Sequence, residues 1–114
     1  MSTLFRQQAV GAGGGAEQIV ATGGSIVIPE GQKLQITDLL GTYQGVGIQR
    51  IREDNLLDAE ITRVRYAADG TIIAGLGTPA EILGVVGGKT IVVTEEGAFA
   101  NSLTVVGVME PLNA

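Results

Sequence analysis

Short β-rich runs separated by turn residues recur along most of this chain, and this rhythm constrains its fold more than any other feature. The run Lys33-Leu34-Gln35-Ile36-Thr37 alternates polar and apolar residues with period two, the pattern of a half-buried strand. Before it, Pro29-Glu30-Gly31-Gln32 has the composition of a tight turn. About eight such runs follow one another at spacings of roughly 8 to 12 residues, which predicts a sandwich or a barrel.

Length and composition agree with a single ordered domain. A chain of 114 residues can bury one core, and 45% hydrophobic against 17% charged residues is typical of a globular protein. The 18 glycines have no three-residue period, which excludes collagen and indicates many tight turns. Connections of mixed length favour a jelly roll over a meander. We therefore expect an all-β, jelly-roll-like β-sandwich of about eight short strands over residues 17–114.

Residues 1–16 differ in composition from the rest of the chain, and we expect a flexible, glycine-rich, extended N-terminal arm there. Leu4 and Phe5 form a small apolar pair beside Arg6, and the run Gly11-Ala12-Gly13-Gly14-Gly15 has few side chains to pack. Two interpretations are evenly matched. The arm is a frayed terminus, or it is a tether whose Leu4-Phe5 anchor docks on a neighbouring subunit or partner.

The stretch from Glu53 to Ala68 is ambiguous between a helix and a strand. Leu57, Ile61 and Val64 recur at helical spacing, whereas Glu60 to Tyr66 is rich in β-branched and aromatic residues. The dipeptide Asp69-Gly70 that follows is a strong hairpin signal when β-rich runs flank it. We favour a strand over residues 60–66 that continues into a hairpin.

Residues that carry chemistry are scarce. The chain has no Cys and no His, so thiolate and imidazole nucleophiles, bases and zinc ligands are missing. None of its three serines lies in a Gly-x-Ser-x-Gly elbow. The acidic group Glu53, Asp54, Asp58 and Glu60 does not match a calcium loop, and we interpret it, like Glu95-Glu96, as a solvated charged bend. We expect no catalytic residue, no cofactor and no metal.

Charge and hydropathy limit the classes of binding partner that we expect. The net charge of −5 opposes nucleic-acid binding, which needs a basic surplus to displace counterions. No apolar run approaches the ~20 residues of a membrane helix, and the N-terminus lacks a secretory pattern. We expect a soluble protein, made in the cytoplasm, that binds neither nucleic acid nor membrane.

Four arginines form the constellation most suggestive of binding. Arg50 and Arg52, and likewise Arg63 and Arg65, would project from one sheet face, and the two pairs adjoin if their strands pair. We favour pairing within the chain, with Glu53, Asp58 or Glu60 as partners. The alternative is a patch that forks onto carboxylates of a partner protein.

Two segments carry a family resemblance. Ile28 to Asp38, with the order Ile-Pro-Glu-Gly-Gln-Lys-Leu-Gln-Ile-Thr-Asp, and Asn101 to Val108 resemble small jelly-roll modules of virus-like particles. With its glycine-rich arm, the chain resembles the tailed-phage capsid decoration (cement) proteins, by pattern over most of residues 17–110 and without a diagnostic motif. The resemblance implies a structural virion protein without catalytic residues, made in the host cytoplasm. It further implies binding to neighbouring major capsid subunits on the outer capsid surface.

The same resemblance implies a homo-oligomer, dimer or trimer, with Leu4, Phe5, Arg6 and the four arginines as contact candidates. One alternative is a small ligand- or carbohydrate-binding β-sandwich module, although sugar sites usually stack on aromatic rings and this chain has two Phe, two Tyr and no Trp. A cupin-like enzyme is the weakest alternative, because such barrels usually hold a metal with several His.

Overall fold

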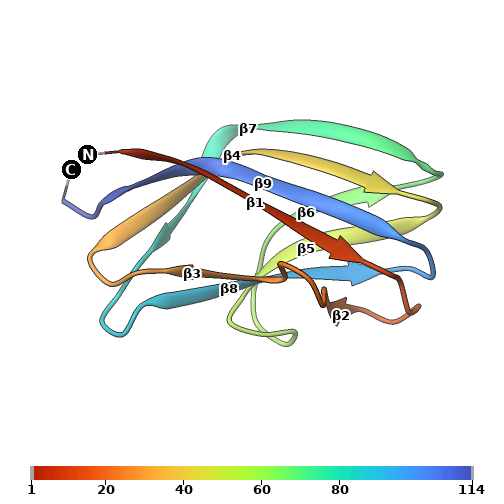
Figure 1. Cartoon of the computed structure of the whole chain (residues 1–114), viewed down its shortest axis with the longest axis horizontal. Helices are drawn as coiled ribbons and strands as arrows, with labels where there is room; N and C mark the ends of the chain where they lie inside the picture. The colour runs from red at the N-terminus through yellow and green to blue at the C-terminus, as the bar shows by residue number, and fades with distance from the viewer. Residues whose placement is uncertain (1, 114) are drawn as a thin grey trace.

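Two antiparallel sheets make up the computed structural model, which describes residues 2–113 (Figure 1). Sheet A has the order β1 (Thr3–Gly11), β9 (Asn101–Pro111), β4 (Gln32–Tyr43), β7 (Gly70–Leu83). Sheet B has the order β2 (Gln18–Ile19), β8 (Lys89–Glu96), β5 (Gly47–Glu53), β6 (Glu60–Tyr66), and β3 (Ser25–Ile28) also pairs with β8. Within residues 2–113 there is no helix that could cross a membrane.

The strand pairing is that of a jelly roll, so the predicted fold class is confirmed. Pairs form from the two chain ends inward: β1 with β9, β2 and β3 with β8, β4 with β7, and β5 with β6. Successive pairs alternate between sheets A and B, as when one long hairpin is rolled up. Counting β2 and β3 as one interrupted strand gives the eight strands of this topology.

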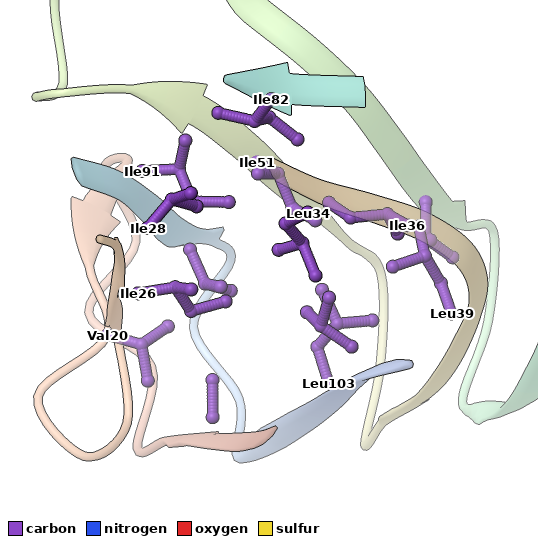
Figure 2. Packing of buried hydrophobic residues seen from close by; sticks show 14 of the residues in the cluster. Val20, Ile26, Ile28, Leu34, Ile36, Leu39, Ile51, Ile82, Ile91 and Leu103 are labelled. Carbon is purple, nitrogen blue, oxygen red and sulfur yellow. The ribbon is translucent and has the colours of Figure 1, made fainter. Parts of the chain in front are cut away.

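The core lies between the sheets and follows from period-two alternation. Leu34 and Ile36 of β4 are fully buried, as the alternating run 33–37 predicts, and they face Ile26 and Ile28 of β3 across the sandwich (Figure 2). Val27, between the two isoleucines, is 62% exposed. Each fully buried aliphatic side chain contributes about 1.5–3 kcal/mol of transfer free energy, so this double row helps to hold the two sheets together.

The strand predicted over Glu60 to Tyr66 is present as β6, but the hairpin predicted after it is wrong. β6 pairs with β5 in sheet B, whereas β7 begins at Gly70 and pairs with β4 in sheet A. The Asp69-Gly70 turn therefore carries the chain across the sandwich. An Asp-Gly turn can join two strands of one sheet or connect two sheets, so the dipeptide alone does not distinguish the two. Here the long-range pairing of β7 with β4 places β7 in sheet A.

The expected N-terminal arm is also wrong for residues 3–11. They form β1, which pairs along its whole length with β9, from Thr3↔Met109 to Gly11↔Asn101. Ala9 is 1% exposed, and the Gln7 side chain donates to the carbonyls of Gly23 (2.9 Å) and Ser25 (2.8 Å). Residues 1–16 are therefore no separate unit: the part described here belongs to the same domain as residues 17–113.

The glycine run is a site of close packing rather than a linker. A Cβ on Gly11 would lie 2.5 Å from a carboxylate oxygen of Glu95, and Gly13, at φ +85°, donates its N–H to the same carboxylate at 2.8 Å. A side chain at Gly11 would have to displace a carboxylate that is itself held in place, which is why the chain approaches so closely here with glycine.

We predict that Gly11→Ala lowers the free energy of unfolding by about 1–3 kcal/mol, because the added methyl group overpacks the Glu95 site. Gly77→Ala is the matched control: it is also a strand glycine, and a Cβ there meets no atom within 4 Å. Urea denaturation of both variants measures the difference. Equal stability of the two would contradict the packing described for Gly11.

Candidate functional site

The outer face of sheet B gathers all four arginines. Cross-strand pairing places Arg50 opposite Arg63, and Ile48 of β5 opposite Arg65. Arg52 lies two residues beyond Arg50 on β5, opposite Glu60. Like charges directly opposite each other are destabilising, so this face requires carboxylates close by.

Carboxylates do surround the two arginines of β5. Arg50 pairs with Glu60 (Nε–Oε1, 3.0 Å), with Glu17 (Nη1–Oε1, 3.1 Å) and with Glu96. Arg52 binds Glu17 in a bidentate contact, with Nε–Oε2 at 2.6 Å and Nη2–Oε1 at 3.0 Å. These bonds are charge-assisted and partly shielded from water, which makes them stronger than exposed ion pairs. Both guanidinium groups are thus committed within the chain.

Glu17 is the residue of this network that sequence reasoning missed. It precedes the two-residue strand β2 and is far along the chain from β5, so no local spacing pattern points to it. Its carboxylate also accepts a 2.7 Å hydrogen bond from the Thr94 hydroxyl. The Arg52 hydrogen bond, aided by Thr94 and the charge of Arg50 and opposed by burial, holds the pKa of Glu17 below its ordinary value of 4.5.

The partners proposed from the sequence are only partly those found. Glu60 does pair, and its bond to Arg63 is the main cause of its lowered pKa. Asp58 offers only its backbone carbonyl, to Arg52, and Glu53 pairs instead with Lys89 at 3.4 Å. Glu53, Asp54 and Glu60 are therefore held in ion pairs, whereas the Asp58 carboxylate forms none among residues 2–113. The bend expected here is present over residues 54–58, but it is only partly a free solvated one.

Arg65 differs from the other three arginines. Its side chain is exposed, and no carboxylate of residues 2–113 lies within 4.0 Å of it. It borders an open groove of about 510 Å³ at the end of sheet B where β5 begins and where β6 and β8 end. The groove has apolar walls and one acidic residue; it is lined by Val46, Ile48, Arg65, Tyr66, Ala67 and Glu96, with Gly15, Gly47 and Gly97.

Two tyrosines support the floor of this groove. The rings of Tyr43 and Tyr66 pack with centroids 5.2 Å apart, and burial raises the pKa of Tyr66 to about 12. The Tyr43 hydroxyl is buried without a hydrogen-bond partner among the described residues, and burial raises its pKa too. A Cβ on Gly97 would lie 2.6 Å from that hydroxyl, so the groove wall at Gly97 is bare backbone.

A chain of buried polar groups ties the groove floor to both sheets. Tyr66 donates to Gln49 (2.7 Å), Gln49 donates to Asn101 (3.2 Å), and Asn101 donates to Glu95 (2.8 Å). Glu95 is 2% exposed and lies inside β8, so the solvated turn expected at Glu95-Glu96 is wrong. Its carboxylate is satisfied by the Gly13 N–H, by Asn101 and by Gln18.

The N-terminal candidates lie on the opposite side of the molecule. Leu4 is 76% exposed and Arg6 is exposed on the outer face of sheet A, whereas Phe5 packs against the core. Strand alternation therefore separates Leu4 from Phe5, and the pair does not form one anchor. Sheet A also keeps all three residues apart from the arginines of sheet B. Within residues 2–113 no group of three or more acidic side chains is placed to hold a metal ion.

Comparisons with known proteins give no family. No protein-family model matches the chain, and no curated protein is significantly similar to it. Among solved structures, it is similar to a chain in "Structure of infectious bursal disease virus Gt strain", with a TM-score of 0.36 and 11% sequence identity. The match covers 96% of this chain and 32% of the viral chain, so this chain spans about a third of that chain's length. A similarity this distant bears on neither family nor function.

We predict that Glu17→Gln lowers the free energy of unfolding at pH 7 by about 1.5–3 kcal/mol, the value of a hydrogen bond to a charged group. The folded-state pKa of Glu17 is depressed, so its contribution is present above pH 4.5 and is lost as pH falls through the lower folded value. The gap between wild type and variant should close in acid. Denaturation across pH measures it.

The control for this prediction is Glu81→Gln, which removes a carboxylate 48% exposed and 3.7 Å from Lys33. Exposed pairs contribute about 0–1 kcal/mol, so this variant should stay close to wild type at pH 7. A Glu17 variant as stable as wild type at pH 7, or a gap that persists in strong acid, would refute the role assigned to Glu17.

Proposed function

We propose that this chain is a non-catalytic structural protein that attaches to a partner protein through the groove beside Arg65. The observation that carries the proposal is the contrast among the four arginines. Arg50, Arg52 and Arg63 are held by carboxylates of the chain, whereas the guanidinium of Arg65 has none among residues 2–113 and lies beside an apolar hollow. A guanidinium that pairs with no carboxylate of residues 2–113 is well suited to form a bidentate contact with a carboxylate of a partner.

The groove adds selectivity to that contact. Val46 and Ile48 offer apolar surface next to the cation, and the Glu96 carboxylate on the same wall is already engaged by Arg50. A partner segment with one carboxylate beside an aliphatic or aromatic side chain fits this arrangement. A polyacidic segment fits less well, because it would meet Glu96 as a like charge.

The finer proposal is that the partner is the major capsid protein of a tailed phage. This chain would then decorate and staple the outer capsid surface, after synthesis in the host cytoplasm. The support is an analogy: the jelly-roll strand order, and the resemblance of the segments Ile28 to Asp38 and Asn101 to Val108 to decoration proteins. Modest contacts suffice in this role, because a symmetric shell presents many equivalent sites.

We predict that Arg65→Ala weakens binding to empty shells of the co-encoded major capsid protein by about 10- to 100-fold, the loss expected for one charge-assisted contact. The matched control is Lys89→Ala. It also removes one positive charge, but Lys89 lies beside a different hollow, with Ile61 and Leu83, and is paired with Glu53 and Asp54. Co-sedimentation of each variant with the shells measures the affinity.

The outcomes separate the two levels of the proposal. Wild-type affinity in Arg65→Ala would show that the groove is not the contact surface. Failure of the wild-type chain to bind the shells would overturn the capsid partner. A hit in a glycan array, lost in Arg65→Ala, would then favour the alternative of a small ligand- or carbohydrate-binding module.

A further inference from the structure

The first half of β7 is a sheet edge that lacks the features that usually protect one. β7 pairs with β4 on one side and with no strand of residues 2–113 on the other, and it forms the upper rim of sheet A in Figure 1. Exposed edges can pair with another chain, and proteins protect them with charges, proline, bulges or very short strands. Residues 70–75 have none of these. No charged residue occurs between 70 and 80, and the register break and Pro79 come only after residue 75.

The other three edges of the two sheets are protected. β6 carries the charged residues Glu60, Arg63 and Arg65. β2 and β3 are only two and four residues long. The edge of β1 is bridged by the following loop, where the Val10 N–H donates to the Thr22 carbonyl at 2.9 Å. The contrast singles out the first half of β7 as an edge that is open to pairing.

The hydrogen-bond pattern shows which backbone groups of β7 are turned outward. In an antiparallel ladder, every second residue bonds to the same neighbouring strand. The Gln44 N–H donates to the Ala100 carbonyl at 3.1 Å, so Thr42, two residues earlier on β4, bonds to β9 and not to β7. Its neighbour on β7, Thr71, therefore turns its N–H and C=O away from β4. By the same alternation, the outward groups of this stretch are those of Thr71, Ile73 and Gly75.

The core is only partly covered at this edge. Ile72 lies opposite Gly41, a buried position of β4, and so faces inward. Ile72 and Leu76 of β7 pack against the core but stay partly exposed, as does Ile61 of β6. On the outer face, Ile73 is 74% exposed. A strand added beside β7 would place alternate side chains next to the inward residues and the remaining ones next to Ile73.

We infer that β7 accepts an extended segment of a different protein as a fifth strand of sheet A. The segment is uncharged along the edge and carries β-branched or other apolar side chains at every second position, where they cover Ile72 and Leu76. Main-chain hydrogen bonds supply the affinity in such strand addition, and the alternate side chains supply the specificity. The β7 strand of a second copy is less suited to supply this cover, because its inward side chains already pack against its own core. The edge shares no residue with the Arg65 groove.

The test uses a synthetic peptide, Lys-Thr-Val-Thr-Ile-Thr-Val-Thr-Glu, blocked at both ends, with the full chain followed by NMR. Its middle is an uncharged alternating strand, and its ends keep it soluble and neutral. Titration should shift the amide signals of residues 70–76 and should slow hydrogen exchange at Thr71, Ile73 and Gly75. The same peptide, N-methylated at its isoleucine and at both neighbouring threonines, should bind at least about 10-fold more weakly, because it lacks the donors for the edge.

The matching variant is Ile73→Pro, which removes one outward N–H without removing a bond to β4. It should raise the dissociation constant of the peptide by about 10-fold, whereas Ile73→Thr keeps the N–H and the β-branch and should stay within about 3-fold of wild type. Val27→Pro is the control on the edge of β3. Val27 is 62% exposed, and because the Val93 N–H bonds to Gly24, the alternation turns the Val27 N–H outward as well. This variant should bind the peptide like wild type.

Three results would overturn the inference. One is the absence of shifts in residues 70–76 at about 1 mM peptide. A second is equal affinity for the N-methylated peptide, or equal affinity of Ile73→Pro and wild type. The third is protection of the Thr71, Ile73 and Gly75 amides in the chain without peptide, because the edge would then already be paired with a second copy. None of these results depends on the Arg65 groove or on binding to capsid shells.

Discussion

The buried carboxylate of Glu95 is the constraint on which most of this structure depends. A carboxylate that is 2% exposed must have its hydrogen-bonding capacity met, or burying it costs several kcal/mol. Two of its three donors, the Gly13 N–H and the Gln18 amide, lie close to the N-terminus, and the third is Asn101 at the start of β9. The N-terminal segment, β8 and β9 must therefore come together for any of them to be stable.

The same constraint positions the proposed binding surface. From Glu95 the buried bonds run through Asn101 and Gln49 to Tyr66, whose ring lines the groove beside Arg65. Just beyond Gly13 and Gly15, Glu17 reaches the outer face of sheet B and holds Arg50 and Arg52. The N-terminal segment thus also holds Arg50 and Arg52, whereas Arg63 is held by Glu60. Of the four arginines of sheet B, Arg65 is the one without a carboxylate among the described residues.

How far the sequence predicts this structure depends on how local each signal is. Alternation in residues 33–37 and β-branching in residues 60–66 are local signals, and they identified β4 and β6 correctly. The strand β1 was missed because its inward positions, Phe5, Gln7, Ala9 and Gly11, include a polar residue and a glycine, so period two is hidden. Arginine pairing within the chain was foreseen, but Glu17 could not be, because only the folded chain brings it to β5.

The most direct test of this account compares urea denaturation of the full chain with that of a chain lacking residues 2–16. The deletion removes β1 and the Gly13 donor, exposes the edge of β9, and leaves Glu95 buried without its full set of partners. The account predicts a loss of more than about 3 kcal/mol in the free energy of unfolding, or no cooperative transition at all. A truncated chain with the same midpoint and slope as the full chain would contradict it, because the N-terminal segment would then be a dispensable arm.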